Sequence, residues 1–270
     1  MHVVKGIVTM IMVLYLILGA AAGLMAGLFG VGGGLIIVPA LIVSFSFQDL
    51  SPDILTQLAI GTSLATIIFT SLSSIKTHHS KGAIDWALVK RLTVGIVIGA
   101  VLGSIFADYL PGDTLQMIIG IYALTVAVQM GFDIKPTAQH DLPQGAGLTV
   151  AGGIIGAISA LFGIGGGSLT VPYLSWCRVE MRNAVATSSA CGLPIAVAGV
   201  CSYIVTGWNN PELPAYSLGY IYLPAFFGII ITSTVFAKQG AKLAHSLPSH
   251  VLKRYFALLL LVVGSKFIFF

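Results

Sequence analysis

Two glycine-rich stretches interrupt long apolar runs, and their residue types and spacing could do chemistry. Each reads Gly-x-Gly-Gly-Gly and is followed five residues later by a proline, Pro39 or Pro172. The copies stand 133 residues apart, from 30 to 163 and from 39 to 172. We call residues 30–34 the first glycine break and residues 163–167 the second. The motif glycines are Gly30, Gly32, Gly33 and Gly34 in the first and Gly163, Gly165, Gly166 and Gly167 in the second.

A glycine break inside an apolar run can bind an anion. When a short helix follows the break, its first backbone N–H groups are free and its dipole favours negative charge. Two such breaks approaching from opposite sides of a membrane would form a symmetric anion cradle. The alternative is that the glycines only allow close helix packing, which is common in membrane proteins.

Hydroxyl side chains follow each break on the next long apolar segment. An Ala-x-x-Thr-Ser pattern ends at Ser63 in one half of the chain and at Ser188 in the other. Such hydroxyls could complete the hydrogen bonds of an oxyanion, or they could bond to helix carbonyls instead. The candidate substrate site therefore also includes Thr62, Ser63, Thr187 and Ser188.

Two further glycine ladders are typical of helix packing rather than binding, because their members recur every four residues. They are Gly19, Gly23 and Gly27, and Gly95, Gly99 and Gly103.

The middle of each apolar segment lacks Asp, Glu, Lys, Arg and His. Proton relays and charged selectivity rings place such residues there, so the sequence does not favour either mechanism. It also contains no nucleophile–base set, Walker motif or metal-ligand cluster. We therefore expect no enzymatic activity, no cofactor and no metal. The three cysteines, Cys177, Cys191 and Cys201, lack CxxC spacing and are interpreted as small apolar residues.

The composition defines the environment of these motifs. Of 270 residues, 57% are hydrophobic and 8% charged, whereas soluble domains carry about 25% charged residues. The sequence predicts an all-α, multi-pass protein of the cytoplasmic membrane, with the lipid bilayer as its surroundings. The basic residues lie in short loops, which indicates topology rather than a nucleic-acid partner. The apolar segments are 6–28, 34–46, 55–75, 87–107, 114–131, 145–161, 167–177, 183–206, 217–237 and 249–269.

The segments divide into two groups of five around a polar stretch at 132–144. We predict a first repeat at 1–131, a cytoplasmic linker at 132–144 and a second repeat at 145–270. The glycine breaks, the Thr-Ser patterns and a Leu-Pro pair at 110–111 and 247–248 recur in the same order in both halves.

Corresponding loops of the two halves carry opposite charge character. The loop at 76–91 has four basic residues, whereas 207–216 has none. The loop at 47–54 is acidic, whereas 177–183 contains two arginines. Cytoplasmic loops are enriched in Lys and Arg, so the halves are predicted to insert upside down relative to each other. Inverted-topology repeats are typical of secondary transporters with sites near the membrane midplane.

This orientation turns each glycine break into the tip of a hairpin. If 132–144 and 178–182 are both cytoplasmic, residues 145–177 must leave and return on the same side. The second arm, 167–177, would span about 16 Å at 1.5 Å per residue, or half a bilayer. By the same reasoning, 6–46 forms a hairpin that enters from outside. Each repeat is therefore predicted to contain one broken-helix hairpin and three transmembrane helices.

The paired Gly-x-Gly-Gly-Gly…Pro stretches, each followed by Ala-x-x-Thr-Ser, resemble the TauE/SafE family of sulfite and organosulfonate exporters. The resemblance covers essentially the whole chain. It implies a small permease for sulfur-containing anions.

The leading hypothesis is a secondary transporter of a small sulfur-containing oxyanion, working by alternating access around a midplane site between the two hairpin tips. A passive anion channel and a permease for another small organic anion are the alternatives. An intramembrane enzyme or an accessory subunit has the least support, because the chain lacks a catalytic set. The sequence leaves open the direction of transport, the coupling ion and whether the chain forms a homo-oligomer.

Overall fold

The computed structural model describes residues 2–29, 33–48, 50–132, 141–143, 145–243 and 249–269. Within these ranges the chain forms ten helices, and the only extended pairing is one isolated bridge between Ser217 and Tyr222. The helices are α1 (His2–Phe29), α2 (Gly34–Ser46), α3 (Pro52–His79), α4 (Trp86–Tyr109), α5 (Gly112–Gly131), α6 (Ala146–Phe162), α7 (Gly167–Trp176), α8 (Met181–Gly207), α9 (Leu223–Leu243) and α10 (Ser249–Phe269).

Local sequence signals define several helix ends. Pro52 is the first residue of α3, where the absence of its N–H costs nothing. The carboxylate of Asp85 accepts the N–H of Leu88 at 2.9 Å and so caps α4. Helix α6 ends at Phe162, and the capping residue Gly163 has a φ of 67°, a left-handed conformation that glycine adopts easily.

The apolar segments predicted from the sequence agree with the helices to within about four residues at each end, with one exception. The predicted segment 217–237 is wrong at both ends, because α9 spans Leu223–Leu243. The residues before it form an irregular loop. Tyr220 and Ile221 in this loop are buried, and the Tyr220 N–H donates to the carbonyl of Tyr203 in α8 at 3.1 Å. The loop is apolar because it packs into the bundle, not because it is helical.

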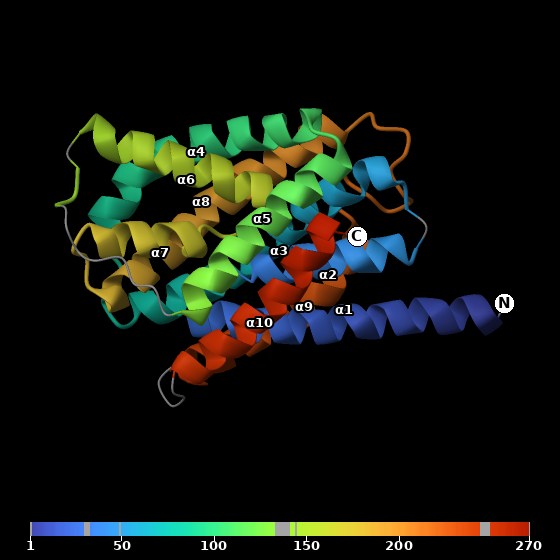
Figure 1. Cartoon of the computed structure of the whole chain (residues 1–270), viewed down its shortest axis with the longest axis horizontal. Coiled ribbons are helices and arrows are strands. Elements are labelled where there is room, and N and C mark those ends of the chain that lie inside the picture. Colours follow the sequence, from blue (N-terminus) through green and yellow to red (C-terminus); the bar gives the residue numbers. More distant parts are fainter. Residues whose placement is uncertain are drawn as a thin grey trace.

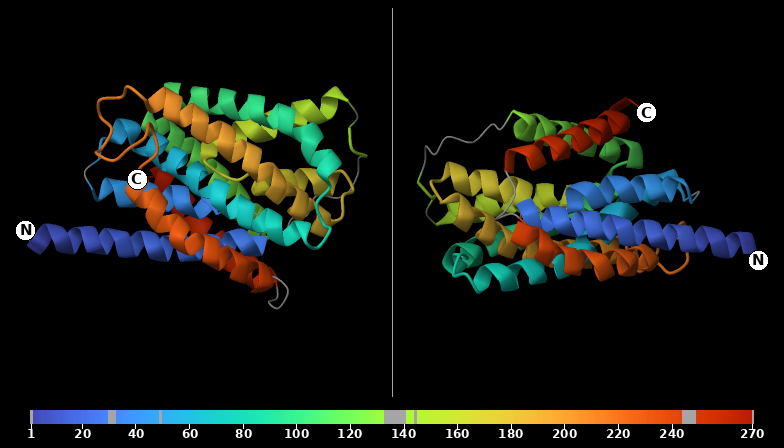
Figure 2. Two further views of the ribbon diagram at one scale, coloured as in Figure 1. Left: turned by 180° about the vertical axis from the view of Figure 1, so that it is seen from behind. Right: turned by 90° about the horizontal axis from the view of Figure 1, so that it is seen from below.

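Two helix pairs, α1–α2 and α6–α7, are each interrupted by a glycine break. The first helix of each pair packs against a helix from the opposite half of the chain. Helix α1 lies along α9, and α6 lies along α4 (Figures 1 and 2). Helices α3 and α8 pack on each other, and α5 pairs with α10. The pairings are therefore reciprocal between the two halves.

The glycine ladders form the two closest of these contacts. A methyl group on Gly19 or Gly23 would overlap the carbonyls of Ile229 and Ser233 in α9. Methyl groups on the ladder in α4 would overlap three carbonyls of α6, and the pairs are Gly95 with Thr149, Gly99 with Gly153, and Gly103 with Ala157. The structure thus confirms the packing role predicted for these five glycines.

Long apolar helices make this a multi-pass membrane protein. Five helices among the described residues are long and apolar enough to span a bilayer, and they are α1 (over Met10–Gly27), α3, α4, α5 and α8. Large apolar side chains of α4, such as Ile98, Leu102 and Phe106, are exposed on the surface of the bundle. They are suited to contact with lipid.

Candidate functional site

The two glycine breaks meet inside the helical bundle. A methyl group on Gly34 would overlap the carbonyl oxygen of Gly163 and lie 2.8 Å from the Cα of Ile164. The hydroxyl of Ser63 in α3 donates to the same Gly163 carbonyl at 2.8 Å. Two segments more than a hundred residues apart are therefore in backbone contact. Only glycine at position 34 permits an approach this close.

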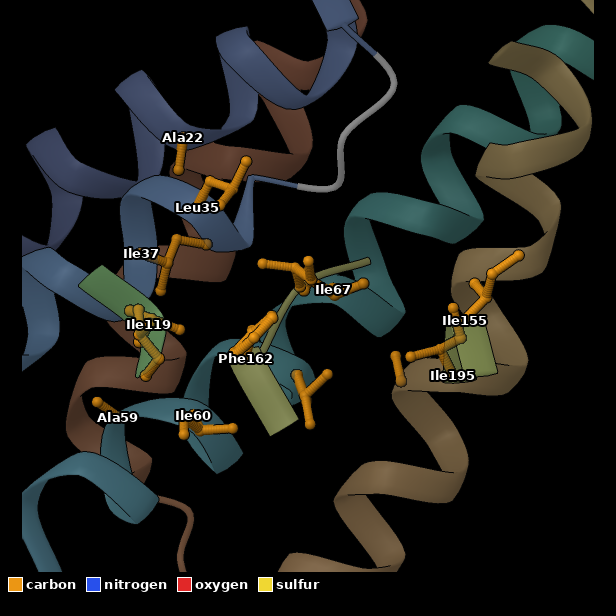
Figure 3. Close-up of a cluster of buried hydrophobic side chains, with 14 of the residues drawn as sticks. Ala22, Leu35, Ile37, Ala59, Ile60, Ile67, Ile119, Ile155, Phe162 and Ile195 are labelled. Carbon is orange, nitrogen blue, oxygen red and sulfur yellow. The ribbon is translucent and has the colours of Figure 1, made fainter. Parts of the chain in front are cut away.

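Large apolar side chains enclose this contact. Figure 3 shows the surrounding cluster, to which α2 contributes Leu35 and Ile37, α3 contributes Ile60 and Ile67, and α6 contributes Phe162. Gly163 itself is tightly packed, because a methyl group there would lie 2.7 Å from Val38 and 3.1 Å from the Cα of Ile60. The meeting point of the breaks is thus shielded from water by well-packed side chains.

The same backbone conformation occurs at corresponding positions of both breaks. Gly33 has a φ of 73° and Gly166 a φ of 74°, and each precedes a short helix. The Gly33 carbonyl accepts the N–H groups of Ile36 and Ile37 at 3.0 and 3.1 Å. The Gly166 carbonyl accepts those of Leu169 and Thr170 at 3.0 and 2.6 Å. Proline at the sixth helical position, Pro39 or Pro172, is tolerated in both short helices.

These conformations leave free donors at the start of each short helix. In α2 they are the N–H groups of Gly34 and Leu35, and in α7 those of Gly167 and Ser168, none of which has a hydrogen-bond partner among the described residues. Gly30 and Gly32, also predicted site residues, lie outside the described residues. The predicted glycines Gly165, Gly166 and Gly167 are buried.

The two predicted threonines cap helices of the opposite half. The Tyr222 N–H, just before α9, donates to Thr62 of α3 at 2.9 Å. The Asp85 N–H, just before α4, donates to Thr187 of α8 at 3.1 Å. These bonds satisfy backbone donors that helix ends leave unpaired. Each threonine hydroxyl still has a hydrogen to donate.

The loop that Thr62 anchors is itself held by a buried tyrosine. Burial raises the pKa of Tyr220 to about 12, so its phenol stays neutral at physiological pH. Its oxygen accepts the side-chain N–H of Asn210 at 3.1 Å. The carbonyl of Tyr220 lies so close to Gly61 that a methyl group there would overlap it.

The predicted serines have different surroundings. Ser63 contacts the second glycine break through Gly163, as described above. Ser188 is fully buried, and its hydroxyl has no hydrogen-bond partner among the described residues. The residue that corresponds to Gly163 by the repeat is Gly30, which lies outside the described residues.

Two hydroxyls beside the second break were missed by the sequence reasoning. Ser159 lies in the last turn of α6 and Thr170 in the first turn of α7, and both are completely buried. A methyl group on Gly166 would lie 3.4 Å from the Thr170 hydroxyl and 3.6 Å from that of Ser159. A comparison of the repeat copies could have found them, because the residues 133 positions earlier are Ala26 and Ile37.

The buried polar groups are uncharged. Within the described part of the chain, the buried polar groups are the side chains of Ser, Thr and Gln and the phenols of Tyr15, Tyr203 and Tyr220. No group of three or more His, Cys, Asp or Glu able to hold a metal occurs among the described residues. The ion pair between Arg178 and Asp141, at 3.1 Å, lies on an exposed surface. Binding at the glycine breaks would therefore rely on N–H groups, hydroxyls and helix dipoles.

The fold and the meeting of two broken helix pairs define a multi-pass helical membrane protein. The model of the sulfite exporter TauE/SafE family matches residues 15–267. The chain belongs to this family of membrane transporters, which are not enzymes. This confirms both the family resemblance and the prediction that the chain is not an enzyme.

Curated relatives support the assignment over most of their length. The chain is 40% identical over 252 residues to a "Probable membrane transporter protein" of Haemophilus influenzae, covering 93% of this chain and 96% of the relative. It is 28% identical over 246 residues to a similarly named protein of Methanocaldococcus jannaschii, covering 88% of each. A relative from Bacillus subtilis is 27% identical over 278 residues, covering 95% of this chain and 97% of the relative. No solved structure matches the chain.

Proposed function

We propose that this protein is a secondary transporter that moves a small sulfur-containing oxyanion, sulfite or an organosulfonate, across the cytoplasmic membrane. The description of its family supports the substrate class. The observation that carries the proposal is the contact between the glycine breaks at Gly34 and Gly163, with free N–H groups at the start of α2 and α7. Such helix starts bind anions.

The proposed mechanism is alternating access between two inverted repeats. Reciprocal pairings of α1 with α9 and α6 with α4 support this arrangement, as do the reciprocal caps made by Thr62 and Thr187. Through these contacts, the hairpin α1–α2 packs on α9 and the hairpin α6–α7 packs on α4. Rotation of these two composite units about α3 and α8 would open the glycine breaks to one side of the membrane at a time.

The two ends of the bundle fit opposite sides of a membrane. The α2–α3 and α8–α9 connections lie at one end, and α3–α4 and α7–α8 at the other (Figure 1). At the first end, Ser51 donates to the Glu212 carboxylate at 2.6 Å. In our proposal the first end is outside and the second, with its basic residues, is cytoplasmic.

The absence of buried charge among the described residues favours a weakly charged substrate. A strongly hydrated dianion would lose its hydration shell with no cation to offset that cost. Bisulfite or a monovalent sulfonate loses less hydration free energy on entering such a site. The proposed site therefore selects singly charged anions.

Flux into proteoliposomes tests the proposal. We expect saturable transport of sulfite or an organosulfonate, measured against carboxylates and sulfate, with and without a pH gradient. Linear flux up to high millimolar substrate with channel-like conductance would indicate a passive channel instead. Saturable flux of carboxylates alone would indicate a permease for other organic anions.

Labelling of introduced cysteines tests the topology. Single cysteines within 47–54 and within 207–216 should both react with an impermeant maleimide from outside intact cells. Reaction of one loop from outside and of the other from inside would refute the inverted arrangement.

A further inference from the structure

The two glycine breaks share a backbone conformation but differ in the side chains around them. At the second break, Ser159 and Thr170 place hydroxyls near Gly166, at 3.6 and 3.4 Å from the position of a methyl group built there. Their counterparts at the first break, Ala26 and Ile37, are apolar and buried. The breaks are therefore alike in geometry and unlike in hydrogen-bonding capacity.

The hydroxyls of Ser159 and Thr170 are buried and unpaired within the described part of the chain. Both residues are completely buried, and neither hydroxyl oxygen has a hydrogen-bond partner among the described residues. An unpaired buried hydroxyl is destabilising, and such groups normally have a protein or water partner. In helices, Ser and Thr usually donate to the carbonyl four residues earlier, as Ser104 does to Ala100 at 2.8 Å. A purely structural role for these two hydroxyls would require a hydrogen-bond partner, and none exists among the described residues.

Free backbone donors lie beside these hydroxyls. The N–H groups of Gly167 and Ser168 begin α7, and neither has a hydrogen-bond partner among the described residues. The side chain of Ser168 is held by Tyr122, whose phenol donates to it at 2.6 Å. Tyr122 in turn stacks on Phe162, with ring centroids 4.5 Å apart. The first turn of α7 is thereby fixed by an aromatic pair.

We propose that the transported anion binds at the second glycine break alone, with the hydroxyls of Ser159 and Thr170 and the N–H groups of Gly167 and Ser168 as its donors. The first break, with Gly34 against Gly163, closes the site and contributes no side-chain donor. This inference rests on the proposed transport function and replaces a symmetric cradle by a one-sided site.

The donor set specifies the chemistry of the ligand. Hydroxyls from α6 and α7 lie near Gly166, while the backbone donors come from the start of α7. An anion with several acceptor oxygens on one centre can accept from more than one of these groups at once. The sulfo group of a sulfonate and the bisulfite ion meet this requirement, whereas a halide offers no directional acceptors.

Substitutions that remove only the hydroxyls test the site. The variants are Ser159→Ala, Thr170→Val and the double variant. Ser233→Ala is the matched control, because Ser233 in α9 is also fully buried without a partner but belongs to the α1–α9 contact. The measurements are the half-saturation concentration for sodium sulfite in proteoliposomes and the sulfite-induced rise in Tm of the purified protein.

We expect each single variant to raise the half-saturation concentration by about 10- to 100-fold, which is the size of one hydrogen bond to a charged group, and the double variant to raise it by more. The sulfite-induced rise in Tm should disappear in the double variant. Without sulfite, all variants should have a Tm equal to or above that of the wild type, because each loses an unpaired hydroxyl. Ser233→Ala should transport normally.

The outcomes separate this inference from the proposed function. Saturable wild-type flux together with an unchanged half-saturation concentration in the double variant would overturn the one-sided site and leave the transport function standing. Wild-type protein that neither transports nor is stabilised by any anion of the panel would overturn both. An equal rise in the half-saturation concentration of Ser233→Ala would also overturn the inference, because the effect would then not be specific to the second break.

Discussion

The first and second glycine breaks have the same backbone and different surroundings. Gly33 and Gly166 share a left-handed φ, and each carbonyl accepts two N–H groups of the following helix. Hydroxyls of Ser159 and Thr170 face the second break, whereas Leu35 and Ile37 pack near the first. The two breaks therefore share a shape, and in our proposal the side-chain differences let the second break bind the anion and the first close the site.

The largest expected effect comes from separating the two breaks. Gly34→Ala should reduce sulfite flux in proteoliposomes to background, because its methyl group would overlap the Gly163 carbonyl. Gly131→Ala is the control, since among the described residues a methyl group on Gly131 would meet only the Cβ of Ala257, at an ordinary contact distance of 3.7 Å. Wild-type flux in Gly34→Ala would show that the contact between the breaks has no part in transport.

Alanine substitutions of the two serines in the Thr-Ser patterns should differ in their effect on the stability of the protein. Ser63→Ala leaves the Gly163 carbonyl without its side-chain donor, at a cost of about 1–3 kcal/mol in the free energy of unfolding. Ser188→Ala removes a hydroxyl that has no partner among the described residues and should not destabilise. Denaturation of the purified variants measures both. Equal destabilisation would mean that Ser188 makes an equivalent bond.

The two capping threonines should instead behave alike. Thr62→Val and Thr187→Val each remove the acceptor of one backbone N–H, that of Tyr222 or Asp85. Loss of such a cap costs about 1 kcal/mol. Thermal unfolding should show similar decreases in Tm for the two variants. A large decrease in one only would argue against the reciprocal arrangement of the halves.

The smallest effect is expected at the surface. Arg178→Ala removes the ion pair with Asp141, whose side chains are 58% and 88% exposed. Exposed pairs contribute about 0–1 kcal/mol, so both Tm and sulfite flux should stay close to wild type. A marked loss of flux would assign Arg178 a role beyond this pair, such as attracting anions at the proposed cytoplasmic end.

Much of the architecture could be predicted from the sequence, because lipid imposes apolar helices of a narrow length range and glycines mark their breaks. The helix bounds and the packing ladders at Gly23 and Gly99 follow from such local patterns. The buried loop at Tyr220 was mistaken for helix because burial and helicity both require apolar residues.

The contacts between the halves could not be predicted in the same way. The bond from Ser63 to Gly163 and the cap from Thr187 to Asp85 join residues about a hundred positions apart. No local periodicity encodes such pairs. The roles of Ser159 and Thr170 depend on which hydroxyls find partners after packing, and composition does not reveal this.

The packing of helices from one half on helices from the other has a consequence for assembly. Glycines of α1 rest on carbonyls of α9, and glycines of α4 rest on carbonyls of α6, so the best-fitting surface of each half is supplied by the other. Expressed separately, the halves would each present an unmatched small-residue stripe to lipid. They should regain a native fold only when co-expressed, as complementing fragments of one intertwined folding unit. Under the inverted-repeat arrangement that we propose, a single-half ancestor would have had to work as an antiparallel dimer.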